Sequence, residues 1–193
     1  TFLKMDFGIG LVKNITGALV GEKFWQGQSE WDQSRPGNLS NTKHPFTSIQ
    51  INDLGLEKMT EYVDQVREIV GYEIPLAADH FGHFDTNTAI RLGHAVEKYQ
   101  LAWLEDMVPW FYTEKWKEIT HAINTPTLTG EDIFGKEEFK KLVDTHAVDM
   151  IQPDLATAGG ILETKKIGDY AEENGVAMAL HMAGTPVSMM ANV

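Results

Sequence analysis

The chain has 193 residues, of which 42% are hydrophobic, which is enough for one ordinary globular domain with a packed core. Its 28 acidic and 16 basic side chains give a net charge of -12, which argues against nucleic acid or an anionic membrane surface as a partner. It contains no cysteine and no apolar run of about 18 to 20 residues, so we expect a cytoplasmic protein without disulfides or spanning helices.

Short apolar segments alternate with longer helical patterns along the chain. A strand is expected at 1–8 and an amphipathic helix at 53–71, while the polar segment 14–50 predicts a long loop or insertion. Further strands are expected at 72–79, 101–106, 125–132, 148–154 and 176–181, and helices at 86–99, 113–122, 136–145 and 160–175. Nearly apolar strands that are each followed by a helix predict an α/β fold with a parallel sheet.

The predicted strands end in polar side chains that suit a metal site. Four strands finish in a carboxylate and the fifth in an imidazole: Asp79, Glu105, Glu131, Asp154 and His181. Their spacings of 26, 26, 23 and 27 residues each match about one strand and one helix, so they are expected at the carboxyl end of the sheet. Converging carboxylates repel one another, and a divalent cation relieves that repulsion. Asp79, Glu105 and Glu131 are therefore candidate ligands of one Mg²⁺, which prefers oxygen donors.

The remaining pair, Asp154 and His181, predicts a general base. A carboxylate bonded to one imidazole nitrogen orients the ring and raises the basicity of the other nitrogen. A histidine at a strand end is as often a structural residue, but a metal cluster at the same end of the sheet favours the role of general base. For Asp106 and Asp132, which follow two proposed ligands, helix capping or support of the metal site is the favoured interpretation.

These motifs, in this order, resemble the enolase superfamily, and in particular its mandelate racemase-like subgroup. They are Asp79, WLED at 103–106, TGED at 129–132, IQPD at 151–154, GGI at 159–161 and ALH at 179–181. The resemblance implies a (β/α)8 TIM-like barrel, present here as a partial barrel of about strands 2 to 7. It also implies Mg²⁺ on the three acids and a base formed by His181 with Asp154. Family chemistry removes a proton alpha to a carboxylate and forms an enediolate.

Lys4 and Asp6 stand where the family carries a Lys-x-Lys motif. Lys4 matches the first lysine, which in the family contacts the substrate carboxylate, and its charge would help to stabilise the enediolate. Asp6 replaces the second lysine, the usual base on the opposite face of the substrate. One-base chemistry from His181 is therefore expected, which favours loss of water over racemisation. Asp6 is expected to bind substrate hydroxyls or to support the metal.

Several other side chains are candidates for the rest of the pocket. His80 and His83 flank Phe81, where relatives often have an asparagine, and either could protonate the departing hydroxide. Aromatic residues that could wall a sugar-sized pocket are Phe24, Trp25, Trp31 and Trp110. For each of these histidines and aromatics a structural role is at least as common.

The sequence thus predicts a Mg²⁺-dependent dehydratase that acts on a small-molecule carboxylate, a sugar acid. Two alternatives stay open: a racemase, epimerase or cycloisomerase that uses the same intermediate, and a catalytically silent barrel used for binding. Superfamily members also carry an amino-terminal capping domain and the first and last barrel strands. We expect these parts to belong to a larger protein or to be supplied at an interface, and we expect a homo-oligomer.

Overall fold

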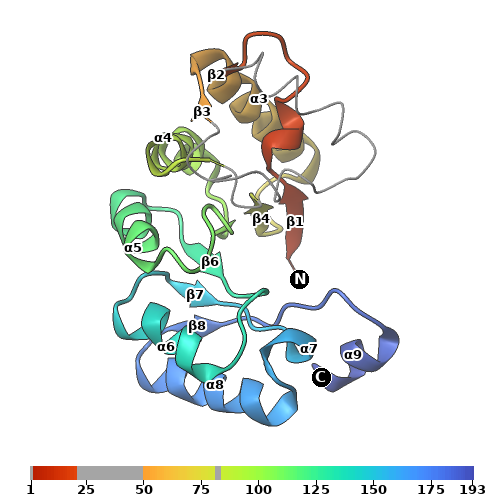
Figure 1. Ribbon diagram of the computed structural model, residues 1–193. Coiled ribbons are helices and arrows are strands. Elements are labelled where there is room, and N and C mark those ends of the chain that lie inside the picture. Colours follow the sequence, from red (N-terminus) through yellow and green to blue (C-terminus); the bar gives the residue numbers. More distant parts are fainter. Residues whose placement is uncertain (1, 21–49, 81–83) are drawn as a thin grey trace. The chain divides into compact units, whose positions relative to one another are not determined.

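Parallel strands that alternate with helices build both parts of the chain in this computed structural model (Figure 1). The structure describes residues 2–20, 50–80 and 84–193. The chain divides into a first unit, Thr1–Pro109 with Ile123–Thr125, and a second unit, Trp110–Ala122 with Pro126–Val193. Among the helices of the described residues, none combines the length and the hydropathy that a membrane-spanning helix requires.

The described residues of the first unit include three parallel strands. They are β1 (Leu3–Asp6), β4 (Leu76–Asp79) and β5 (Leu104–Glu105). Strand β4 pairs with β1 on one side and with β5 on the other, so Asp79 lies beside Asp6 and beside Glu105 in register. All four residues of β4 are buried, which explains its apolar sequence up to the final carboxylate. The carboxyl ends of these strands therefore gather the polar side chains.

The described residues of the first unit also form helices. They are η1 (Ile9–Leu11), α3 (Asp53–Val70), α4 (Thr86–Val96) and η3 (Glu97–Tyr99). Helices α3 and α4 both begin at a polar cap, because Asn52 accepts a hydrogen bond from the amide of Gly55 and Asp85 accepts one from Thr88. The buried guanidinium of Arg67 near the end of α3 donates to four backbone carbonyls and ties α3 to the segments before β4 and β5.

Part of the predicted loop at 14–50 forms a small sheet. Strands β2 (Leu19–Val20) and β3 (Gln50–Ile51) pair in the antiparallel direction. Strands of two residues are too short to produce an alternating pattern, so the sequence did not predict them. Residues 21–49 lie outside the described residues, and with them the pocket-wall candidates Phe24, Trp25 and Trp31.

The second unit repeats the strand and helix alternation. Its parallel strands are β6 (Thr127–Thr129), β7 (Met150–Ile151) and β8 (Ala177–Met178), with β7 in the middle. Its helices are α5 (Thr113–Ala122), α6 (Lys136–Asp144), α7 (Leu155–Ala158), α8 (Ile161–Glu173) and α9 (Pro186–Ala191). Figure 1 shows α6 and α8 side by side. Fully buried Trp116, Leu128 and Phe139 contribute to its core.

The predicted order of strands and helices agrees with the structure, but their lengths differ. The strands have two to four residues, whereas the apolar runs suggested longer ones. Helix α4 ends at Val96 and continues to Tyr99 only as the 3-10 helix η3. Helices α7 and α9 were not predicted. Helix α7 has a single turn, because it begins after the cap Asp154 and ends at Gly159, which adopts a φ of 118°.

Candidate functional site

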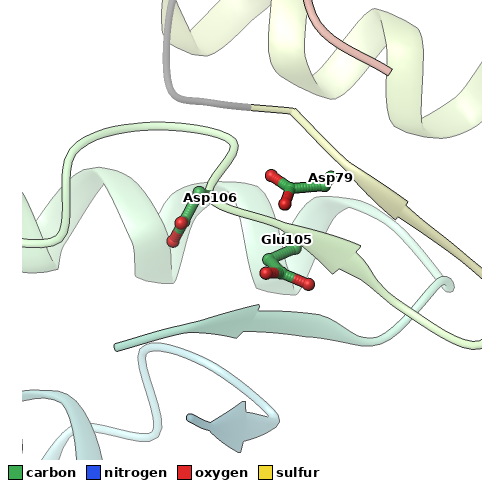
Figure 2. Close-up of side chains that lie close together, drawn as sticks. All are labelled: Asp79, Glu105 and Asp106. Atoms are coloured by element: carbon green, nitrogen blue, oxygen red, sulfur yellow. The ribbon is translucent and has the colours of Figure 1, made fainter. Parts of the chain in front are cut away.

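Three carboxylates meet at the ends of β4 and β5 in the first unit (Figure 2). Asp79, Glu105 and Asp106 each offer one oxygen, and these oxygens all lie within 4.8 Å of one another. Asp79 is 6% exposed and Glu105 is 0% exposed. Neighbouring residues of an extended strand normally point to opposite faces, but Asp106 has a φ of 48°, which breaks that alternation. Aspartate tolerates this left-handed conformation better than most residues do.

The ammonium of Lys4 binds two of these carboxylates. Lys4 Nζ lies 2.6 Å from Glu105 Oε1 and 3.0 Å from Asp79 Oδ2. Burial lowers the pKa of Lys4, but the hydrogen bonds from its ammonium to Glu105 and Asp79 outweigh burial and raise that pKa above its ordinary value. The two carboxylates thus accommodate a positive charge between them. A set of hard oxygen donors that already holds a cation fits Mg²⁺.

Trp103 is a further member of this site, to which the sequence assigned no role. Its indole Nε1 donates a hydrogen bond of 2.9 Å to Glu105 Oε2. The signal that could have found it is the spacing, because residues two apart on a strand point to the same face. Asp106 was expected to cap a helix or to support the metal site. In the structure it is the third carboxylate of this cluster within the first unit.

In the second unit, the structure brings the predicted base and its partner together. His181 Nδ1 lies 2.8 Å from Asp154 Oδ2, and the backbones of the two residues form an isolated parallel bridge. The other oxygen of Asp154 accepts from the amide of Ala156 as the cap of α7. Burial raises the pKa of Asp154, but hydrogen bonds from His181 and from the amides of Ala156 and Ala183 outweigh burial and lower it. Asp154 therefore stays ionised and orients the imidazole ring.

Glu131 contacts the other nitrogen of the same imidazole. Its Oε2 lies 2.9 Å from His181 Nε2. An imidazole nitrogen that donates a hydrogen bond already carries a proton, so Nε2 must be deprotonated and free of Glu131 before it can accept a proton from a substrate. Glu131 follows Gly130, whose φ is 145° and where a Cβ would lie 2.9 Å from the backbone nitrogen of Gln152. Only glycine fits this backbone conformation, which sets the direction of the Glu131 side chain. Glu131 belongs to the second unit, and its place as a metal ligand beside Asp79 and Glu105 stays a prediction.

The other candidate residues have structural contacts. The ring of His80 is 1% exposed and meets the ring of Phe84 edge-on, with centroids 4.5 Å apart. The exposed Asp6 accepts from the amide of Gly8. Trp110 is half-buried and stacks edge-on against Phe111. The catalytic or substrate-binding roles of these residues stay predictions, and His83 lies outside the described residues together with Phe81.

Comparison with known proteins decides the family. Residues 38–193 match the family described as enolase C-terminal domain-like. The chain belongs to this family. Its predicted fold class is thereby confirmed: the chain is part of the α/β barrel domain of the enolase superfamily, with parallel strands and alternating helices.

Relatives within the superfamily include named dehydratases. The D-xylonate dehydratase of Haloferax volcanii is 35% identical over 137 residues, which make up 71% of this chain and 33% of that protein. The L-talarate/galactarate dehydratase of Salmonella typhimurium is 36% identical over 118 residues, 61% of this chain and 30% of that protein. The chain spans about a third of the length of these curated relatives.

Solved structures agree with this membership. A mandelate racemase/muconate lactonizing enzyme-like protein from Rubrobacter xylanophilus has a TM-score of 0.71 at 35% identity, over 73% of this chain and 36% of that one. A mandelate racemase/muconate lactonizing enzyme from Sulfitobacter sp. has a TM-score of 0.73 at 30% identity, over 78% of this chain and 38% of that one. At these identities both the fold and the family are shared.

The lowered pKa of Asp154 predicts a specific loss of stability in acid. Because the folded pKa lies below the unfolded value of about 3.9, Asp154 stabilises the fold above that value, and this contribution is lost as pH falls through the folded pKa. Urea unfolding of the wild type and of Asp154→Asn from pH 7 to pH 3 measures it. We expect the difference in free energy of unfolding to be largest near neutral pH and to shrink below about pH 4. A difference that stays constant with pH would contradict the assignment.

Proposed function

We propose that the protein to which this chain belongs is a Mg²⁺-dependent dehydratase of a sugar acid. The observation that carries the proposal is the Asp154–His181 hydrogen bond of 2.8 Å, which orients an imidazole at a strand end. An oriented imidazole suits removal of a weakly acidic proton near neutral pH. The names of the D-xylonate and L-talarate/galactarate dehydratases support a sugar acid as the substrate.

The charge that develops on the substrate carboxylate must be stabilised for such a proton to leave. We assign Mg²⁺ binding to Asp79, Glu105 and Glu131, with Asp106 beside them. When bound, the cation supplies electrostatic stabilisation of the negative charge on the substrate. Lys4 supplies a second positive charge, since its raised pKa keeps the ammonium protonated. In this proposal Lys4 binds the substrate carboxylate and stabilises the enediolate.

His181 is the proposed base, and Asp154 fixes which nitrogen acts. Since Nδ1 is bonded to Asp154, Nε2 is the nitrogen that takes the alpha proton. Its contact with Glu131 must break in the reactive form, which fits a Glu131 that turns to the metal. His80 or His83 would then protonate the hydroxide that leaves from the beta carbon, and Trp110 would line the pocket.

The residue that replaces the family's second lysine favours dehydration over racemisation. A racemase needs a base on each face of the alpha carbon, and Asp6 occupies the place of the family's second lysine. Asp6 is exposed and its carboxylate accepts from the Gly8 amide, so it suits a bond with a substrate hydroxyl better than removal of an alpha proton. The racemase, epimerase and cycloisomerase alternatives share the first step and differ in the product.

Replacement of His181 tests the base directly. We expect His181→Gln to lower kcat for dehydration by about 10²- to 10⁴-fold, because general-base catalysis contributes that much. The complete protein is screened against sugar acids in D2O, with detection of 2-keto-3-deoxy products and of alpha-deuterium exchange. The matched control is His121→Gln, an exposed histidine of α5, which should leave kcat unchanged.

Three results of that screen would count against the proposal. If His181→Gln dehydrates the substrate at the wild-type rate, His181 is not the general base. A wild-type product of changed configuration with no loss of water would favour a racemase or epimerase. Tight binding of sugar acids with neither exchange nor product would favour the catalytically silent barrel.

Replacement of Lys4 tests whether an ammonium and a divalent cation share the same oxygens. Lys4→Met removes one positive charge within 3.0 Å of Asp79 Oδ2, so Mg²⁺ should bind more tightly. We expect the Kd to fall by about 3- to 10-fold, since a unit charge at this range in a watery surrounding is worth about 1 kcal/mol. Titration calorimetry without substrate measures the change, and exposed Lys13→Met is the control. Unchanged or weaker Mg²⁺ binding by Lys4→Met would contradict the shared site.

A further inference from the structure

The buried carboxylate of Glu105 is bonded on both of its oxygens. Lys4 Nζ reaches Oε1 at 2.6 Å, and the indole Nε1 of Trp103 donates to Oε2 at 2.9 Å. Glu105 itself is 0% exposed. A carboxylate without access to solvent depends on protein donors for its orientation, so the donors on its two oxygens contribute to which way these oxygens face.

The backbone and the packing hold the Trp103 indole in place. Ala78 donates its amide to the Trp103 carbonyl at 3.1 Å, and His80 donates its amide to the Glu105 carbonyl at 2.9 Å. Both ends of this three-residue segment are thus tied to β4 and the residue after it. The indole ring also packs against the ring of Phe2, with centroids 5.2 Å apart and planes tilted by 51°. A donor fixed by its backbone and by a neighbouring ring is pre-organised to hold the carboxylate.

The two donors on Glu105 differ in how they respond to a bound cation. The Lys4 ammonium carries a positive charge, so a divalent cation on the same oxygen repels it. An indole N–H is neutral and can only donate, so it keeps its bond to Oε2 while a cation binds the carboxylate. Of the two, Trp103 is the donor compatible with the metal-bound site.

We propose that Trp103 is a positioning residue for the metal ligand Glu105. Its indole N–H holds Oε2 and thereby presents Oε1, the oxygen that Lys4 reaches, to the divalent cation. The inference rests on the proposed metal site and adds to it a residue that acts through Glu105. Outer hydrogen-bond partners of metal ligands typically contribute about 10- to 100-fold to metal affinity. Trp103 thus contributes to metal affinity without touching metal or substrate.

The test is equilibrium binding of Mg²⁺ and of Mn²⁺ to the complete protein without substrate. Trp103→Phe removes the N–H and keeps an aromatic ring to pack on Phe2, and it should raise the Kd for both ions by about 10-fold or more. The matched control is Trp116→Phe, because the Trp116 indole nitrogen is buried without a hydrogen-bond partner among the described residues. That variant loses the same atoms from a fully buried site and should keep the wild-type Kd.

The outcomes separate this inference from the metal site itself. A folded Trp103→Phe that binds both ions within twofold of the wild type would overturn the positioning role while the metal site stands. A wild type that binds neither ion would overturn the metal site, and the role of Trp103 with it.

If Trp103→Phe does not fold, the indole N–H resonance of Trp103 in the NMR spectrum of the wild type tests the positioning role instead. Phe2→Leu, which removes the neighbouring ring and keeps the donor, assigns that resonance to Trp103. A shift of the assigned resonance on addition of Mg²⁺ supports the role, and a resonance that does not move overturns it.

Discussion

Repulsion between carboxylates at the ends of parallel strands is the constraint on which the site depends. Parallel pairing sets Asp79 beside Glu105 in register, and the turn at Asp106 adds a third acid. Buried acids this close cannot all stay ionised without a positive charge nearby. The ammonium of Lys4 provides one such charge, and a divalent cation is the other that suits these oxygens. In our proposal the chemistry uses both.

In the second unit, two carboxylates likewise flank a nitrogen-bearing side chain, here an imidazole. His181 lies between Asp154 and Glu131, with one carboxylate on each nitrogen. The bond to Asp154 is reinforced by two backbone amides, so it is the permanent one. The contact with Glu131 has to open before Nε2 can accept a proton. Gly130, whose φ of 145° a residue with a side chain rarely adopts, sets the position of Glu131.

The main features of the fold and site could be predicted because they follow from regular spacing. Strand and helix units of similar length put Asp79 and Glu105 at the same end of their strands, and the same argument applied to Asp154 and His181. What the sequence missed depends on local backbone angles and on tertiary partners. The positive φ of Asp106 leaves no periodic signal, and one-turn α7 is too short to have one. The spacing of Trp103 and Glu105 predicts a shared face of the strand but not the hydrogen bond between them. The prediction of a loop at 14–50 missed the two-residue strands β2 and β3, and its residues 21–49 lie outside the described residues.

Ligation of a divalent cation by Glu105 underlies both proposals, and calorimetric titration of Mg²⁺ into the wild type and into Glu105→Gln tests it. Glutamine keeps the size of the side chain and can still accept from Trp103, so only the charge of the ligand is lost. We expect one Mg²⁺ per chain for the wild type and binding weakened by at least about tenfold in a variant that still unfolds cooperatively. Equal affinity in the two proteins, or no binding by the wild type, would contradict it.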